Sequence, residues 1–261
     1  YMVATPIGNL MDITKRASDV LENVDVIAAE DTRRTNILLK HLGIEKREVT
    51  SFHKFNESRK TPYLLGRIKR GDDVAIVSDA GTPLISDPGF SIVERAWAEK
   101  IPIVPIPGAS SLTAALSVCP LKCDQWSFLG FLPSKSSERL KILSPRLVRP
   151  EALIFFEAPH RIISTLKLLE ELSERSVMVA REITKVFETV YVGSSAEVQR
   201  SIGDNTKGEF LCIVEGSSNE IPDFEAEKVL RVLLEHHDMA TASKITAKIC
   251  GISKKIVYGL A

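Results

Sequence analysis

The residues best suited to bind a polar ligand are small ones that follow a short apolar run. Ser78-Asp79-Ala80-Gly81-Thr82 comes directly after residues 74–77, which have the composition of a buried strand. Small side chains let a ligand approach the backbone, Gly81 permits a positive φ, and Asp79 can accept hydrogen bonds from hydroxyl or amino groups. Because ligands of open α/β sheets bind at the carboxyl ends of strands, we interpret this segment as part of a binding site rather than as a plain turn.

Two further segments have the residues of strand-to-helix junctions. Asp87-Pro88 resembles a helix N-cap followed by proline at the first helical position, so we predict that Asp87 caps a helix over 87–100. At Pro107-Gly108-Ala109-Ser110-Ser111 the free amides of a helix start could bind a ligand. A glycine turn with Ser110 as the helix cap explains this second junction equally well.

Charged side chains follow two other expected strands. Glu30-Asp31-Thr32-Arg33-Arg34-Thr35 comes after one apolar run, and Ser51-Phe52-His53-Lys54-Phe55-Asn56-Glu57 spans the end of another. In a parallel sheet these segments should lie near each other at one edge. The arginines could hold phosphates, and Glu30, Asp31, His53 or Glu57 could accept a proton. The alternative is a helix-start charge cluster with Asp31 as N-cap.

Several common catalytic and binding motifs are absent from the sequence. There is no G-x-G-x-x-G after the first strand, no P-loop, no H-E-x-x-H and no G-x-S-x-G. The four cysteines, at positions 119, 123, 212 and 250, include no second close pair that would complete a zinc site. We interpret them as buried or incidental thiols rather than as metal ligands or disulfides.

The alternation of apolar and helical patterns predicts βαβ units on a largely parallel sheet. Expected strands in the first half lie at 2–5, 24–29, 49–52, 74–77 and 101–106, and expected helices at 13–23, 32–42, 56–70, 87–100 and 110–118. In the second half, strands are expected at 126–132, 152–156, 177–180, 189–192 and 209–214, and helices at 136–149 and 161–172. Only one short helix fits between the last three strands, which predicts a mixed sheet. We expect α/β domains over 1–120 and 121–218, then an acidic connector and small helical domain over 219–261.

Charge is distributed unevenly along the chain. The 261 residues are 44% hydrophobic and 26% charged, as in globular proteins, and 34 basic residues balance 34 acidic ones. Residues 33–70 nevertheless carry a net charge of +8, residues 135–149 add +4, and residues 215–238 are acidic. A basic segment beside a ligand cleft is typical of proteins that bind a phosphate polymer, although solvated helix faces are the alternative. No apolar run approaches the about 18 residues of a membrane span, so we expect a cytoplasmic protein.

Several of these segments occur together in one known family. They are Ala4–Leu10, Glu30–Arg33, Ser78–Gly89, Pro107–Ser110, Phe156–Arg161, Arg181–Lys185 and Lys207–Phe210. In this order they closely resemble the bacterial 16S rRNA ribose 2′-O-methyltransferase I family, which belongs to the tetrapyrrole-methylase superfamily of S-adenosylmethionine (SAM) enzymes. The resemblance spans residues 1–216, and the helical tail resembles the short C-terminal domain of the family more weakly.

The resemblance implies two α/β domains with SAM in the cleft between them, no metal, a homodimer, and methylation of the 2′-hydroxyl of a cytidine in the decoding region of 16S rRNA. The positions that it implies for SAM binding are Pro6, Gly8, Leu10, Ser78, Asp79, Ala80, Gly81, Thr82, Ser110, Ser111, Phe156, Glu157, Ala180, Arg181 and Lys207. Combined with the basic segment, it predicts RNA binding by Arg33, Arg34, Lys54, Asn56, Arg59 and Lys60.

The proton acceptor stays open at this point, with Glu30, Asp31 and His53 as candidates. Two other functions remain as alternatives. A tetrapyrrole-type methylase of small molecules would share the SAM loops without needing the basic segment. A non-enzymatic RNA-binding protein would keep the basic segment and would not bind SAM.

Overall fold

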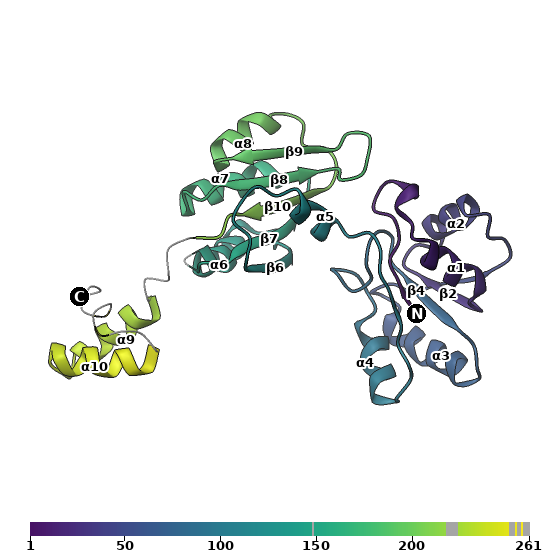
Figure 1. Ribbon diagram of the computed structural model, residues 1–261, viewed down its shortest axis with the longest axis horizontal. Coiled ribbons are helices and arrows are strands. Elements are labelled where there is room, and N and C mark those ends of the chain that lie inside the picture. The colour runs from purple at the N-terminus through teal and green to yellow at the C-terminus, as the bar shows by residue number, and fades with distance from the viewer. Residues whose placement is uncertain (148, 218–223, 251–253, 255–256, 258–261) are drawn as a thin grey trace.

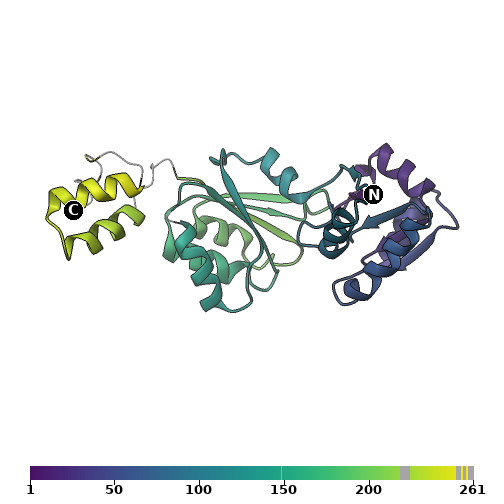
Figure 2. The same ribbon diagram turned by 90° about the horizontal axis from the view of Figure 1, so that it is seen from below.

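The computed structural model describes residues 1–147, 149–217, 224–250, 254 and 257. They form two α/β domains and a pair of C-terminal helices, which lies beyond the second domain and away from the first (Figure 1, Figure 2). The predicted fold class is confirmed. The elements of the first half are β1 Met2–Val3, η1 Leu10–Asp12 (a 3₁₀ helix), α1 Lys15–Asn23, β2 Val26–Ala29, α2 Thr32–His41, β3 Glu48–Ser51, α3 Glu57–Lys69, β4 Val74–Val77, α4 Phe90–Ala98, β5 Pro105–Ile106 and α5 Ser111–Ser117.

The first sheet is parallel throughout, with the strand order β3-β2-β4-β1-β5. All residues of β2 and β4 are buried because helices cover both faces of the sheet. On one face, Leu21 of α1 and Leu38 of α2 pack in a core with β1, β2 and β4. On the other face, Leu64 of α3 and Ile92 of α4 pack against β2 and β4. The carboxyl ends of β1 and β4 therefore lie side by side.

The first residues of α2 and α4 show whether Asp31 and Asp87 act as helix N-caps, as the sequence predicted. The N-cap of α2 is Asp31, whose carboxylate accepts a hydrogen bond from the Arg33 amide, as expected for an aspartate at this position. The prediction for Asp87 is wrong: α4 begins at Phe90 with Gly89 at its N-cap position. The cap comes instead from the start of α3, which packs against α4. There the Glu57 Oε1 accepts hydrogen bonds from the Gly89 and Ser91 amides at 3.2 and 2.9 Å. The Asp87 carboxylate is thereby released from capping.

The second domain is built on a mixed sheet, as predicted. Its elements are β6 Trp126–Phe131, α6 Ser136–Leu147, β7 Ala152–Glu157, α7 Ile162–Leu172, β8 Val177–Arg181, β9 Thr189–Gly193, α8 Ser195–Ile202 and β10 Phe210–Val214. The strand order is β6-β7-β10-β8-β9; the β6–β7 pair is parallel and the others are antiparallel. Helices α6, α7 and α8 cover one face through Leu143, Leu166 and Val198.

Helix α5 covers the other face of the second sheet, although it precedes the expected domain boundary. Its buried residues Leu112 and Ala115 pack against Ile154, Met178 and Leu211. The segment after β5 therefore crosses from one domain to the other, which brings the start of α5 to the region between the two sheets (Figure 1). The division of the chain at residue 120 stays a prediction.

The C-terminal pair consists of α9 Phe224–Leu234 and α10 Met239–Cys250. Leu230, Ala242 and Val257 form a small core of their own. The acidic connector and small helical domain predicted over 219–261 lie partly outside the described residues, which leave out 218–223, 251–253, 255–256 and 258–261. None of the helices in the described ranges is long and apolar enough to cross a membrane.

Candidate functional site

A cavity of about 380 Å³ lies between the two domains. From the first half it is lined by Ile7, Ala80, Gly81, Thr82, Ile85, Ser86, Asp87, Ser110 and Ser111. From the second it is lined by Phe131, Phe156, Glu157, Ala158, Pro159, Ala180, Ile183, Gly208, Glu209, Phe210 and Leu211. Eight of the residues predicted from sequence therefore line one cavity. They are Ala80, Gly81, Thr82, Ser110, Ser111, Phe156, Glu157 and Ala180.

Backbone hydrogen bonds hold the loops of the first domain at this cavity. The Thr5 amide donates to the Gly81 carbonyl at 2.9 Å, and the Gly81 amide donates to the Thr5 carbonyl at 3.0 Å, which joins the ends of β1 and β4. The Thr82 hydroxyl donates to the Ala109 carbonyl at 3.2 Å and adds the loop after β5. Gly81 has a φ of 86°, and a Cβ there would lie 3.3 Å from the Ile7 side chain. The turn therefore requires glycine.

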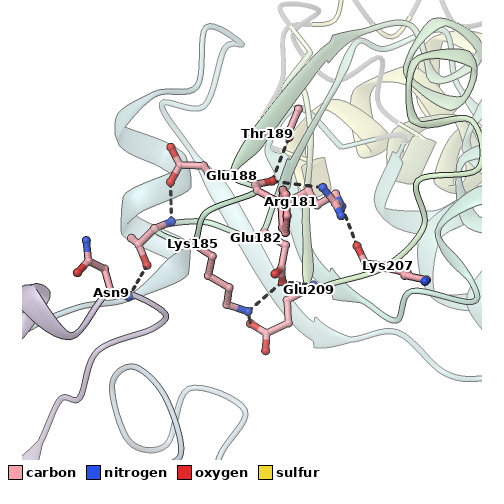
Figure 3. Close-up of polar contacts among 10 residues, drawn as sticks. Asn9, Arg181, Glu182, Lys185, Glu188, Thr189, Lys207 and Glu209 are labelled. Carbon is pink, nitrogen blue, oxygen red and sulfur yellow. Dashed lines mark hydrogen bonds and ion pairs between the residues drawn. The ribbon is translucent and has the colours of Figure 1, made fainter. Parts of the chain in front are cut away.

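The other positions predicted to contact SAM lie elsewhere. Pro6, Leu10, Ser78 and Asp79 line a smaller hollow of about 170 Å³ together with Arg34. Gly8, Arg181 and Lys207 are not among the residues that line either of these cavities. The buried Arg181 guanidinium instead donates to the carbonyls of Lys207 and Phe187, at 2.7 and 3.2 Å, and so fixes the loop before β10 (Figure 3).

Acidic residues converge where β2 and β4 end. The Asp79 carboxylate accepts a hydrogen bond from the Asp31 amide at 2.9 Å, and the Asp79 amide donates to the Glu30 carboxylate at 3.2 Å. Arg34 Nε lies 3.7 Å from Asp79 Oδ2. Hydrogen bonds from the Arg33 side chain and amide hold the pKa of Asp31 far below its usual range. Asp31 is therefore a weak proton acceptor.

Asp87 stands in a different environment. It lines the cavity, and burial raises its pKa to about 7, with further raising by the charges of Glu30 and Asp79 and a lowering by a hydrogen bond with Ser78. Sequence reasoning missed this residue because the Asp-Pro pattern of a helix cap explained it. The cavity-lining residues Phe131 and Leu211 had no signal in the sequence, since their strands read only as apolar runs.

A buried ion pair between Glu157 and Arg161 lies between β7 and α7 of the second domain. Glu157, at the end of β7, is 1% exposed. Its carboxylate accepts hydrogen bonds from the Ala158 amide at 2.7 Å, the Arg161 Nε at 2.7 Å and the Thr165 hydroxyl at 2.6 Å. This network fixes the turn between β7 and α7, which supplies Ala158 and Pro159 to the cavity wall.

The two domains touch at one edge of the cavity through Gly8 and the turn after β8. A Cβ on Gly8 would overlap the Lys185 side chain and lie 2.9 Å from the Thr184 hydroxyl. The Asn9 amide lies 3.3 Å from that hydroxyl and donates to it. Lys185 is held between Glu182 and Glu209, at 2.9 and 3.1 Å (Figure 3). Gly8 is thus required for close approach of the domains.

Some of the residues predicted to bind RNA already contact other side chains, and others do not. The Arg33 guanidinium is bound by the Asp31 carboxylate in two hydrogen bonds. Lys54 and Arg59 are exposed and have no ion pair with any other residue that the structure describes. Lys60 Nζ donates to the Thr50 hydroxyl at 2.7 Å.

Asn56 and His53 belong to the loop after β3. The Asn56 side chain accepts from the His53 amide at 2.8 Å and donates to the Ser51 carbonyl at 3.2 Å, so it holds its own loop. The His53 Nδ1 is buried and has no hydrogen-bond partner among the residues that the structure describes. The Cys119 and Cys123 sulfurs lie 3.8 Å apart as free thiols. Within the described part of the chain, no three His, Cys, Asp or Glu residues gather as a metal site would require.

Two known families match this chain, one over most of the α/β domains and one over the C-terminal segment. The family described as Tetrapyrrole (Corrin/Porphyrin) Methylases matches residues 1–199, and the RsmI C-terminal HTH domain matches residues 220–261. Two proteins named Ribosomal RNA small subunit methyltransferase I are among its relatives. One, from Xylella fastidiosa (strain Temecula1 / ATCC 700964), is 43% identical over an alignment of 266 positions that covers 99% of this chain and 97% of that one. The other, from Escherichia coli O157:H7, is 41% identical over an alignment of 268 positions that covers 100% of this chain and 93% of that one.

Solved structures share the fold at low sequence identity. Uroporphyrin-III-C-methyltransferase from Thermus thermophilus has a TM-score of 0.56 at 19% identity, covering 82% of this chain and 92% of that one. A structure of that enzyme complexed with S-adenosyl homocysteine has a TM-score of 0.56 at 17% identity, covering 82% and 95%. Diphthine synthase has a TM-score of 0.61 at 13% identity, covering 82% and 88%. From its fold and its full-length relatives, the chain belongs to the ribosomal RNA small subunit methyltransferase I family of tetrapyrrole methylases.

Proposed function

We propose that this protein transfers a methyl group from SAM to the ribose 2′-hydroxyl of a cytidine in the decoding region of 16S rRNA. The observation that carries the proposal is a cavity between the two domains, in a chain whose residues 33–70 carry a net charge of +8. The names of its relatives, which describe methyltransferases of small-subunit ribosomal RNA, support rRNA as the substrate.

The residues around the cavity fit SAM. A volume of about 380 Å³ falls within the roughly 300–1,000 Å³ of small-molecule sites. Ala80 and Gly81 leave the backbone accessible, and the Ser110 side chain makes no capping hydrogen bond at the start of α5, so both its hydroxyl and the helix-start amides can bind a ligand. Phe131 and Phe156, whose ring centroids lie 5.2 Å apart, offer a surface for the adenine ring.

When bound, SAM supplies a methyl group activated by a cationic sulfonium. The protein's own residues must then align the hydroxyl with that methyl group and exclude water. Such alignment contributes up to about 7–11 kcal/mol in model reactions. Of the cavity carboxylates, Asp87 has no ion-pair partner among the described residues, and its charged form favours a positively charged ligand.

RNA would bind along the basic surface of the first domain. Lys54, Arg59 and Lys60 lie on the loop after β3 and on α3. Glu57 of this same segment accepts a hydrogen bond from the amide of Gly89, two residues after Asp87, and this contact supports RNA binding near the cavity. The C-terminal helix pair is a second candidate for contact with the ribosome, since the matching family describes it as a helix-turn-helix domain.

We further propose that the protein acts as a homodimer in the bacterial cytoplasm, where the small ribosomal subunit is found. The support for a dimer is the edge strand β9 and the turn before it, where Val186 and Phe187 are exposed together with Val190 and Val192. An apolar sheet edge of this kind favours a covering partner. Light scattering that shows a monomer at micromolar concentration would contradict the dimer.

The proposed function has a direct test. Incubation of the protein with labelled SAM and small subunits that lack ribose methylation should transfer label to one cytidine of 16S rRNA, mapped by nuclease digestion and mass spectrometry. Uroporphyrinogen III serves as the competing substrate. Labelled porphyrinoid together with unlabelled rRNA would indicate a small-molecule methylase, and absence of SAM binding in calorimetry would indicate an RNA-binding protein without this activity.

Replacing Gly8 by alanine is expected to weaken binding of S-adenosylhomocysteine by about 5- to 100-fold. The added Cβ would collide with Lys185 and Thr184 and hold the domains apart, and such overpacking typically costs about 1–3 kcal/mol. Calorimetric titration measures the effect. Gly66→Ala is the matched control, because a Cβ there meets only the Arg70 side chain at 3.7 Å. Equal affinities for the two variants would show that closure at Gly8 does not support binding.

A further inference from the structure

Three carboxylates line the cavity, and two of them are committed to cations. Glu157 is bound by Arg161, Thr165 and a backbone amide. Glu209 Oε2 lies 3.1 Å from Lys185 Nζ. Asp87 has no cation within 4.0 Å among the residues that the structure describes. Asp87 is therefore the cavity carboxylate that can take up a proton without breaking an ion pair.

The backbone holds Asp87 from both sides. Ser86 packs against the second domain, because a Cβ on Gly130 of β6 would lie 3.2 Å from its hydroxyl. On the other side, the Gly89 amide is bound by Glu57. The residues Leu84 and Ser86 have φ values of 75° and 70°, which are strained for residues other than glycine. Such strain persists where surrounding structure enforces it and is common at functional sites.

The charged groups around Asp87 come from several elements. Glu30 follows β2, and Asp79 follows β4 and is paired with Arg34 of α2. Glu157 and Glu209 face the same cavity from the second domain. Burial and the charges of Glu30 and Asp79 raise the pKa of Asp87 to about 7, which is the range in which a general base works best at neutral pH.

We propose that Asp87 is the catalytic residue that accepts the proton of the attacking ribose hydroxyl, an inference that rests on the methyltransferase function proposed above. As the oxygen–methyl bond forms, the O–H bond breaks and its proton passes to an Asp87 carboxylate oxygen. The electron pair of the broken methyl–sulfur bond stays on the leaving sulfur, so charge and atoms balance.

The earlier candidates are less suited to this step. Asp31 is occupied by Arg33, and Glu30 accepts the Asp79 amide. His53, like these two, is not among the residues that line the cavity. Glu30 and Asp31 belong to the acidic cluster that Asp79 organises, and Glu30 acts on Asp87 through its charge.

The test compares Asp87→Asn with wild type and with Asp204→Asn, an exposed aspartate in the loop after α8. With saturating SAM and small subunits, Asp87→Asn should lower the single-turnover rate by 10²-fold or more, since a general base typically contributes about 10²–10⁴-fold. Binding of S-adenosylhomocysteine should change less than threefold. The wild-type rate should rise tenfold per pH unit up to a midpoint near or below pH 7, where Asp87 loses its proton. Asp87→Glu should keep this pH dependence, and Asp87→Asn should lose it.

Thermal unfolding gives a readout independent of methylation. The pKa of Asp87 is higher in the folded than in the unfolded chain, so folding favours its protonated form and wild type loses stability as pH rises from about 4 to 7. Asp87→Asn cannot ionise and should have a higher Tm than wild type at pH 8, with the gap closing towards pH 4. Two results would overturn the role of Asp87. One is an active wild type together with an Asp87→Asn rate within tenfold of the wild-type rate, and the other is a Tm difference between the two proteins that does not vary with pH. An inactive wild type would overturn the proposed function itself.

Discussion

Replacing Glu157 by alanine will lower the free energy of unfolding by about 3–5 kcal/mol, the typical cost of removing one partner from a buried ion pair. The change would leave the Arg161 guanidinium, whose side chain is 14% exposed, without its carboxylate. It would also leave the Thr165 hydroxyl without an acceptor in a fully buried position. Urea denaturation followed by circular dichroism measures the loss.

Glu151→Ala is the matched control for this effect. Glu151 precedes the same strand β7, but its carboxylate is only partly buried and lies 4.0 Å from the exposed Arg149. Partly exposed pairs of this kind contribute about 0–1 kcal/mol, so this variant should unfold near wild type. If both variants lost the same small amount of stability, the network around Glu157 would not be the element that holds the β7–α7 turn.

Replacing Lys54, Arg59 and Lys60 together by glutamine is expected to weaken binding of rRNA fragments by roughly 10- to 10²-fold. Each lost phosphate contact removes about 0.7 from the slope of log affinity against log salt for single-stranded RNA, so the slope should fall by about 2. Arg33 is left unchanged because the Asp31 carboxylate already binds it at the start of α2. Fluorescence anisotropy at several salt concentrations measures both quantities.

The control for this variant removes the same charge elsewhere. Lys122, Lys167 and Arg200 are exposed residues of the second half of the chain, outside both basic segments. Their replacement by glutamine should leave the salt slope unchanged, and neither variant should change the affinity for S-adenosylhomocysteine. Equal salt slopes in the two triple variants would show that RNA does not bind along the loop after β3 and α3.

The elements themselves could be predicted because each depends on local patterns. Residues 74–77 form a strand because four consecutive apolar residues suit a sheet covered on both faces, and α2 ends before Gly43, which has a φ of 71°. The segment Ser78–Thr82 could be assigned to a site for a similar reason. Small residues after a buried strand have one common use in an α/β sheet, and Ala80, Gly81 and Thr82 line the cavity.

Asp87 shows why the rest could not be predicted. Its sequence neighbours match a helix cap, and local preference alone assigns it there. Its actual role depends on Glu57, thirty residues earlier in the chain, which takes over the cap once α3 and α4 pack together. The pKa of Asp87 likewise depends on Glu30 and Asp79, which only the parallel pairing of β2 and β4 brings near it.

The sequence therefore established the fold class, the order of strands and helices, and the segments that supply the first wall of the cavity. These follow from residue type and periodicity, which act within a few neighbours along the chain. Tertiary structure settled how α5 crosses to the second sheet, which carboxylates face the cavity, and which of them pair with a cation. Those properties depend on contacts between residues far apart in sequence, where burial and charge are set by the packing of both domains.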